Sequence, residues 1–239
     1  MDGPDGRRAD PGSARAWPLL GSLALLAVVN LLNNLIAPGQ YVLWAGLGVV
    51  GLAMLARADG LTGGEWGIGP VPPRAARAAL ALAGATAAVL LAGTQLPGVA
   101  EAYADERVTG MSAAQVAGAV LVRVPLGTAL LEELAFRGVL LAMLARRHGT
   151  GRAVLGSSAA FAVWHLAPAL GLAAGNAAVG SALGAHPAAA TSVAVLAAGV
   201  AGAVLCGLRI RYDHVIVPWS VHVTANSGAY LLAWLMARA

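Results

Sequence analysis

Residues 130–141 read LLEELAFRGVLL and place three ionisable side chains inside an apolar run that extends from about residue 124 to 145. On insertion scales, one Asp, Lys or Arg at the centre of a membrane helix costs roughly 2.5 to 3.5 kcal/mol. Ionisable groups at that depth usually face the interior of a helix bundle and mark its function. We therefore expect Glu132, Glu133 and Arg137 to lie inside a bundle, at its functional site.

The composition of the chain is that of a membrane protein. Of 239 residues, 59% are hydrophobic and 11% are charged, whereas a soluble domain has roughly 25% charged residues. The apolar residues fall into runs of about 20, which as helices are long enough to cross a hydrocarbon core. The sequence predicts an all-α, polytopic transmembrane helix bundle of about seven spans, near residues 17–37, 40–56, 74–97, 117–145, 153–172, 189–208 and 215–236.

The rest of the sequence divides the chain into a tail and one membrane domain. Residues 1–16 combine Gly, Pro, Asp and Arg without apolar periodicity, which predicts a disordered cytoplasmic tail. Residues 17–239 are interpreted as a single integral-membrane domain. The loop at 61–73 is rich in Gly and Pro and carries Trp66, a residue type that favours the headgroup level, so we expect an interfacial loop there.

The arginines predict the orientation in the membrane. All 15 basic residues are arginine, and the two sets of alternate span ends carry 11 and two of them, with Arg123 and Arg137 inside a span. The positive-inside rule then predicts a multi-pass protein of the cell membrane with its N-terminus in the cytoplasm and its C-terminus outside. Because the arginines lie at the ends of apolar runs and not on one face of a soluble domain, they indicate no nucleic-acid partner.

Polar residues on three predicted spans lie at one depth. Glu133, His165, Asn226 and His222 are about 12, 12, 11 and 7 residues from the arginine-rich ends of their spans, or roughly 10 to 18 Å deep at 1.5 Å per residue. We predict that Glu132, His165, His222 and Asn226 line one polar cavity, open toward the cytoplasmic half or sideways into lipid. The other histidines fall in loops and are expected to be solvated: His148, His186 and His214.

Spacing within each helix gives the two glutamates different roles. Glu133 and Arg137 are four residues apart and share a helix face, where they can pair, whereas Glu132 points about 100° away. Glu132 has no cation on its own face and is suited to act as a general base. His222 and Asn226 are also four apart, so both reach one site. A purely structural Glu133–Arg137 pair, or a histidine that only bonds between helices, fits the same spacing.

Three motifs in this order resemble those of the CPBP intramembrane proteases, which include the type II CAAX prenyl endopeptidases and bacteriocin-processing proteins. The motifs are Glu-Glu-x-x-x-Arg at Glu132, Glu133 and Arg137, Phe-x-x-x-His at Phe161 and His165, and His-x-x-x-Asn at His222 and Asn226. The resemblance covers about residues 117–230, the expected catalytic core. It implies hydrolysis of a peptide bond inside the membrane, with Glu132 and His165 activating water and His222 and Asn226 assisting. Phe161 is interpreted as core and Arg137 as the partner of Glu133.

The residues leave the mechanism and two rival functions open. Two His and one Glu form a catalytic zinc ligand set, so Glu132, His165 and His222 either hold one zinc ion or act without a metal. Membrane carboxylates and histidines also build the proton relays of transporters, and a non-catalytic membrane partner protein of the same fold is a third interpretation. As a protease, the chain would act on a membrane-associated peptide or protein that enters from the bilayer or the cytoplasmic leaflet.

Overall fold

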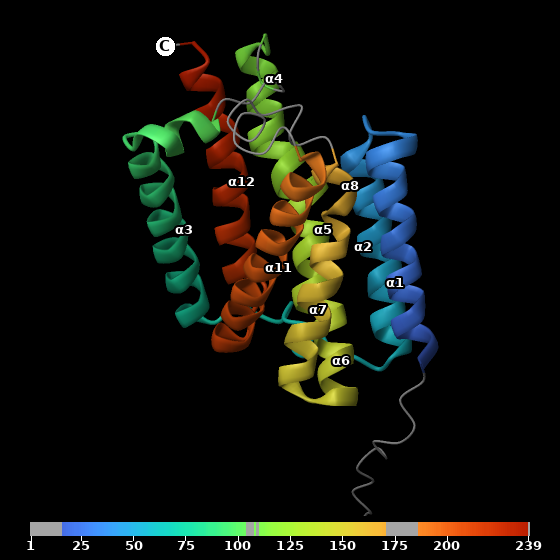
Figure 1. Cartoon of the computed structure of the whole chain (residues 1–239). Coiled ribbons are helices and arrows are strands. Elements are labelled where there is room, and N and C mark those ends of the chain that lie inside the picture. Colours follow the sequence, from blue (N-terminus) through green and yellow to red (C-terminus); the bar gives the residue numbers. More distant parts are fainter. Residues whose placement is uncertain (1–15, 104–107, 109, 171–185, 239) are drawn as a thin grey trace, which may run out of the picture.

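The computed structural model describes residues 16–103, 108, 110–170 and 186–238 of the chain. The predicted tail, apart from Ala16, lies outside these residues. All regular secondary structure within them is helical, and the helices run side by side in one bundle (Figure 1). In chain order the elements are α1 (Ala16–Leu31), η2 (Leu32–Ile36), α2 (Tyr41–Ala58), α3 (Pro73–Gly93), η3 (Pro97–Tyr103), α4 (Ala113–Gly118), η5 (Ala119–Ala129), α5 (Leu130–Glu132), η6 (Glu133–Leu140), α6 (Leu141–His148), α7 (Thr150–Trp164), α8 (Leu166–Ala169), α11 (Pro187–Tyr212) and α12 (Ile216–Met236).

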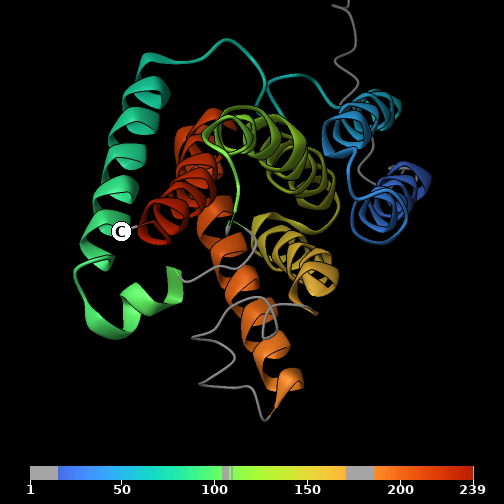
Figure 2. The same ribbon diagram turned by 90° about the horizontal axis from the view of Figure 1, so that it is seen from above.

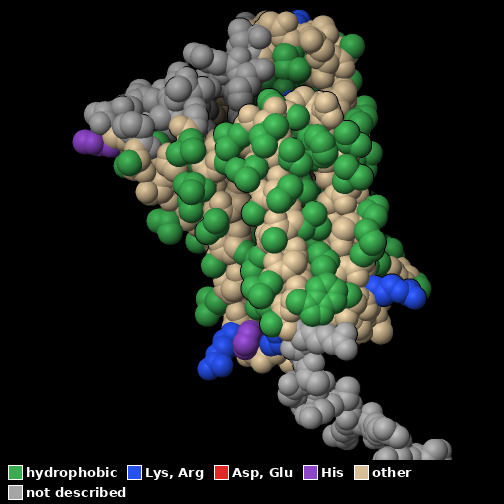
Figure 3. Space-filling model, turned by 90° about the vertical axis from the view of Figure 1, so that its right-hand side faces the viewer, with side chains coloured by type: hydrophobic (Ala, Val, Ile, Leu, Met, Phe, Trp, Pro, Cys, Tyr) green, Lys and Arg blue, Asp and Glu red, His purple; other side chains and the backbone are tan. Residues whose placement is uncertain are grey.

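The bundle is the predicted all-α, multi-pass membrane protein. Five helices in the described residues are long and apolar enough to cross a membrane: Ala16–Ile36, Tyr41–Ala58, Pro73–Gly93, Ala113–His148 and Ala188–Tyr212. The other two predicted spans correspond to α7 with α8 and to α12, which run along the bundle beside them (Figure 1). One face of the molecule is covered with hydrophobic side chains, and its arginine and histidine side chains lie at the two ends (Figure 3). That distribution suits contact with lipid.

Elements α4 to α6 form one continuous helical rod, Ala113–His148, which we call the central rod. Its first turn is fixed by a capping box, in which the Ser112 hydroxyl accepts from the Gln115 N–H at 3.3 Å. Pro125 lies within the π-helical segment η5 and has no N–H to donate to the carbonyl of Val120, five residues earlier. The Ser227 hydroxyl of α12 donates to that carbonyl instead, at 2.9 Å. The irregularity in the rod therefore ties it to α12, the helix that carries His222.

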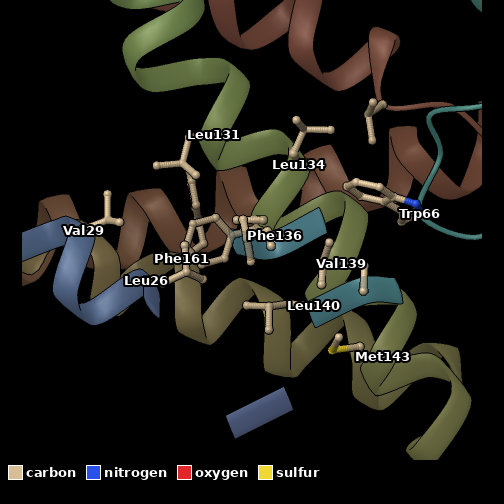
Figure 4. Close-up of a cluster of buried hydrophobic side chains, with 14 of the residues drawn as sticks. Leu26, Val29, Trp66, Leu131, Leu134, Phe136, Val139, Leu140, Met143 and Phe161 are labelled. Carbon is tan, nitrogen blue, oxygen red and sulfur yellow. The ribbon is translucent and has the colours of Figure 1, made fainter. Parts of the chain in front are cut away.

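The core lies between the central rod, α1, α2 and α7 (Figure 4). Because lipid is as apolar as these side chains, close packing and not the hydrophobic effect holds membrane helices together. Gly48 of α2 permits such packing, since a Cβ there would lie 3.0 Å from the Leu131 side chain of the rod. The apolar side chains around this contact include Leu26, Val29, Leu131, Phe136, Val139, Leu140, Met143 and Phe161.

The loop between α2 and α3 packs against the side of the central rod. Trp66 is only 8% exposed and belongs to the core cluster, so its side chain packs inside the protein. Gly138 of the rod lets the loop approach, because a Cβ there would lie 3.1 Å from the Trp66 carbonyl oxygen. Arg209 of α11 donates to the Glu65 carbonyl at 2.9 Å. These contacts fix the loop against the central rod and α11.

Two more contacts hold the loop between α2 and α3. His214 was expected to be solvated, but it is buried: its Nε2 lies 2.9 Å from the Gly69 carbonyl oxygen, and its Nδ1 accepts from the Ile216 N–H. On the other side, Arg146 forms an ion pair with Glu65. Burial alone would raise the pKa of Glu65, but hydrogen bonds from Arg146 and Thr62 outweigh it and lower the pKa to about 2. Glu65 is therefore charged at neutral pH.

The two ends of the bundle differ in charge. We call one of them the arginine-rich end: there α2, α6 and α11 end and α3 and α7 begin (Figure 1). The opposite end, where α2 and α4 begin and α12 ends, carries Arg238 among the described residues. The arginines at the arginine-rich end are Arg57, Arg74, Arg77, Arg146, Arg147, Arg152, Arg209 and Arg211.

Cysteine labelling in intact cells tests the orientation that these arginines predict. Cys206 is buried, so a Cys206→Ala background gives a clean starting point. We expect a membrane-impermeant maleimide to label Glu101→Cys, which is exposed opposite the arginine-rich end, and to label Arg152→Cys only after permeabilisation. The reverse pattern would show that the arginine-rich end lies outside the cell.

Candidate active site

Glu133 is the centre of a buried polar network. Arg137 Nη1 donates to Glu133 Oε1 at 2.9 Å, so the predicted pair is present, and both side chains are at most 1% exposed. His222 Nδ1 lies 2.7 Å from the same oxygen, a contact between the central rod and α12 that the sequence did not indicate. A carboxylate at Nδ1 holds that nitrogen as the donor and turns Nε2 to the opposite side of the ring.

Glu132, the neighbouring residue, points to a different set of partners. Its Oε1 accepts from Trp164 Nε1 at 3.0 Å. Its Oε2 lies 3.9 Å from His165 Nε2 and 3.8 Å from His222 Nε2. These separations exceed a direct hydrogen bond but are within the reach of a single bridging water. One carboxylate oxygen and two imidazole nitrogens thus face a common point, and Arg137 is paired with Glu133 and not with Glu132.

His165 is held at the C-terminal end of α7. Its Nδ1 lies 2.9 Å from the Phe161 carbonyl oxygen one turn earlier, which makes Nδ1 the donor and leaves Nε2 as an acceptor toward Glu132. The Phe161 ring packs edge-on against the His165 ring at 4.4 Å between centroids, and Arg137 Cζ lies 3.9 Å above the same Phe161 ring. Phe161 is therefore core, as expected, and it supports both the ion pair and the histidine.

Trp164 is the residue of this site that sequence reasoning missed. Its indole donates to Glu132, and its backbone carbonyl accepts from Asn30 Nδ2 at 2.9 Å. The only signal available was indirect: a buried Trp N–H usually finds a hydrogen-bond partner, and Trp164 immediately precedes His165 in the sequence. The contact fixes which oxygen of Glu132 is turned toward the two histidines.

A cavity of about 840 Å³ opens beside Glu132. Asn226 lines it together with Glu132, Trp164 and His165. The structure thus brings Glu132, Glu133, His165 and His222 into direct or single-water distance, and it places Asn226 on the cavity wall, one helical turn beyond His222.

The cavity extends to the end of the bundle opposite the arginine-rich end. Tyr41 at the start of α2, Tyr103 at the end of η3 and Met111 before α4 all line it, and these segments lie at that end (Figures 1 and 2). With the orientation predicted from the arginines, the cavity faces the outside of the cell. A cytoplasmic opening of the cavity and a cytoplasmic arginine-rich end are therefore incompatible.

The donor types at the site suit zinc, but their spacing does not. Zinc holds His nitrogens and carboxylate oxygens at about 2.0 to 2.2 Å in a tetrahedron, so that two ligands lie about 3.3 Å apart. The separations from Glu132 Oε2 to the two Nε2 atoms are wider, 3.9 and 3.8 Å. Among the described residues, no group of three or more His, Cys, Asp or Glu side chains has the geometry of a metal site.

Comparison with known proteins finds one family model that matches the chain. The model of a family described as type II CAAX prenyl endopeptidase Rce1-like matches residues 114–228. The matched segment begins in α4 and ends in α12, so it contains α7, α11, all but the first residue of the central rod, and the side chains of Glu132, Glu133, Arg137, Trp164, His165, His222 and Asn226. No curated protein and no solved structure was found to match the chain. Over this core, which is just under half of the chain, the match supports a CPBP family intramembrane protease.

Proposed function

We propose that the chain is an intramembrane endopeptidase that hydrolyses a peptide bond with a water molecule activated at Glu132. The observation that carries the proposal is the convergence of Glu132 Oε2, His165 Nε2 and His222 Nε2, with separations of 3.9 and 3.8 Å from the carboxylate oxygen. A water at this place donates its two protons to two of these acceptors, which polarises it and leaves its lone pairs free for attack on a carbonyl carbon. Hydrolysis of an amide needs this base together with donors for the oxyanion.

The reaction proceeds in two proton-balanced steps. Glu132 takes one proton from the water as the oxygen bonds to the carbonyl carbon, and a tetrahedral oxyanion forms. The proton then passes to the leaving nitrogen as the C–N bond breaks, which gives a carboxylic acid and an amine. Transfer of the acid's proton to the amine leaves a carboxylate and an ammonium group. The amide N–H groups of Asn226, on the cavity wall beside Glu132, are the donors assigned to the oxyanion.

The remaining polar residues hold these groups in position. Trp164 donates to Glu132 Oε1, so that Oε2 stays turned toward the histidines. Glu133 binds His222 Nδ1 and is itself held by Arg137. A carboxylate at Nδ1 orients the imidazole and stabilises its positive charge when it takes up a proton, as the acidic residue of a catalytic triad does.

The proposed substrate is a peptide or protein segment associated with the membrane. The cavity of about 840 Å³ is bordered by both apolar and polar side chains, and it lies within a bundle whose outer face is apolar (Figure 3). A segment that reaches the cavity leaves lipid and meets water and the catalytic base at the same place.

A peptide-cleavage assay with the purified full-length chain distinguishes this function from its two rivals. We expect the protein in detergent to cleave members of a quenched fluorescent library of apolar peptides, and mass spectrometry to find paired fragments. A transporter would leave the library intact and would move protons across proteoliposomes loaded with a pH-sensitive dye. A non-catalytic partner protein would do neither.

A further inference from the structure

Arg123 lies in the same cavity as Glu132 but takes no part in the chemistry described above. It stands nine residues before Glu132 on the central rod, toward the open end of the cavity. Its side chain is half-buried, and no carboxylate of the described residues forms an ion pair with it. An unpaired cation at that depth is costly, and no carboxylate of the described residues pairs with Arg123, so an anionic ligand suits this position.

Two tyrosines hold Arg123 without neutralising it. Its Cζ lies 5.3 Å from the centroid of the Tyr230 ring and 5.9 Å from that of Tyr41, both within cation–π distance. Tyr41 is itself fixed against the rod, because a Cβ on Gly127 would lie 3.1 Å from Tyr41 Cβ. The Tyr230 hydroxyl lies 3.0 Å from Met111 Sδ. The rings hold the guanidinium in place, while its charge remains available to a ligand.

The other residues that line the cavity include uncharged polar and apolar side chains. Asn33 lines the cavity at 4% exposure, and its Oδ1 has no hydrogen-bond partner among the described residues. Asn34 and Thr128 lie on the same wall. Apart from tyrosines, the ionisable groups that line the cavity in the described residues are Arg123, Glu132 and His165. An anionic group is therefore attracted to Arg123 and repelled by the carboxylate of Glu132.

We propose that Arg123 is a specificity-determining residue that binds a carboxylate of the peptide substrate and so sets the direction in which the peptide lies across Glu132. The inference rests on the proposed peptidase function. Nine helical residues span up to about 13 Å, so the carboxylate belongs to a residue separated from the cleaved bond by others. A planar guanidinium with a carboxylate forms a charge-assisted, bidentate pair, which a neutral amide does not replace.

Matched peptides separate charge recognition from general packing. One series carries a single Glu or Gln in an apolar decapeptide with blocked ends, and a second series has a free or an amidated C-terminus. For the wild-type protein we expect kcat/KM to favour the acidic member of one series by about 10- to 100-fold. Arg123→Gln should bring that ratio close to one, Arg123→Lys should keep part of it, and Arg123→Glu should favour a peptide with Lys at the same position.

Arg152→Gln is the matched control, because Arg152 is an exposed arginine at the other end of the bundle; it should leave the ratio unchanged. Equal cleavage of acidic and neutral peptides by the wild type would overturn the proposal, as would an equal loss for both peptides in Arg123→Gln. The assay is run in lipid-free detergent and in phosphatidylglycerol nanodiscs. A dependence on this lipid that Arg123→Gln abolishes, without any peptide preference, would assign Arg123 to a lipid phosphate and overturn the proposal.

A binding measurement keeps this inference distinct from the catalytic one. Fluorescein-labelled acidic and neutral decapeptides are titrated into Glu132→Gln protein and into the Glu132→Gln/Arg123→Gln double variant, and fluorescence anisotropy is recorded. We expect tighter binding of the acidic peptide to the first protein and equal binding of both peptides to the second. Preferential binding without cleavage by the wild type would refute the peptidase and keep the Arg123 site, whereas cleavage without a preference would do the opposite.

Discussion

Glu132→Gln is expected to lower kcat for peptide cleavage by roughly 10² to 10⁴-fold, the usual contribution of a general base, without loss of folded protein. The reason is local. Gln keeps an oxygen that accepts from Trp164 Nε1, which lies 3.0 Å from Glu132 Oε1. Its amide cannot take a proton from the water between Glu132 and the two histidines. The measurement is kcat on the best library peptide, together with the melting temperature in the same detergent. Glu101→Gln, at an exposed position, is the matched control and should leave both values unchanged.

Residues that act as one unit give non-additive losses. We therefore expect a Glu132→Gln/His222→Asn double variant to be no slower than the slower of its two parents. Full activity in Glu132→Gln would refute the assignment of Glu132 as the base. Fully additive losses would mean that Glu132 and His222, 3.8 Å apart at Oε2 and Nε2, act at separate steps.

Arg137→Met is expected to destabilise the folded bundle by roughly 3 to 5 kcal/mol, the usual penalty for breaking a buried ion pair by removing one partner. Arg137 is fully buried, donates to Glu133 at 2.9 Å and covers the Phe161 ring. Its loss leaves the Glu133 carboxylate in the core with His222 as its remaining recorded partner. The measurement is the yield of monodisperse protein and its unfolding in a titration with SDS.

The double variant Arg137→Met/Glu133→Gln supplies the internal control. Because it removes both charges, it should recover part of the stability that Arg137→Met loses, although it should remain inactive since His222 loses its carboxylate. Arg152→Met, at the exposed arginine-rich end, should change stability little. A double variant less stable than Arg137→Met would contradict the view that the uncompensated charge is what destabilises the single variant.

Sequence counting predicted depth well, because membrane helices run nearly parallel and rise by a fixed distance per residue. That is why Glu132, His165 and His222 were expected in one layer, and the structure places their polar atoms within 3.9 Å of Glu132 Oε2. The pairing of Glu133 with Arg137 also followed from a local rule, since residues four apart share a helix face. Their catalytic roles stay a prediction.

Counting residues from the end of a span does not predict how a helix is rotated about its own axis. The contact between His222 and Glu133 joins residues 89 positions apart, and that between Trp164 and Glu132 joins residues 32 apart. Both depend on how α12 and α7 turn against the central rod. Sequence counting places a residue at a depth, but only packing decides which neighbour it faces.

Irregular segments were the least predictable part. In the loop after α2, Trp66 is buried in the core, and in the turn between α11 and α12, His214 is buried although it was expected to be solvated. The cause is a set of contacts from distant helices: Arg146 of α6 binds Glu65, Arg209 of α11 binds its carbonyl, and His214 lies 2.9 Å from the Gly69 carbonyl oxygen. None of these follows from hydropathy, since all of them depend on the tertiary arrangement.

Oxygen-18 labelling tests the central claim most directly, that a water held at Glu132 hydrolyses a peptide bond. The purified wild-type protein and the Glu132→Gln variant are each incubated with the best library peptide in H₂¹⁸O, and the fragments are analysed by mass spectrometry. We predict that the wild type yields two fragments, with one heavy oxygen in the new carboxyl group of the N-terminal fragment and none in the C-terminal fragment, and that Glu132→Gln forms both fragments at least about 100-fold more slowly. Unlabelled fragments, or labelled fragments formed at an undiminished rate by Glu132→Gln, would contradict it.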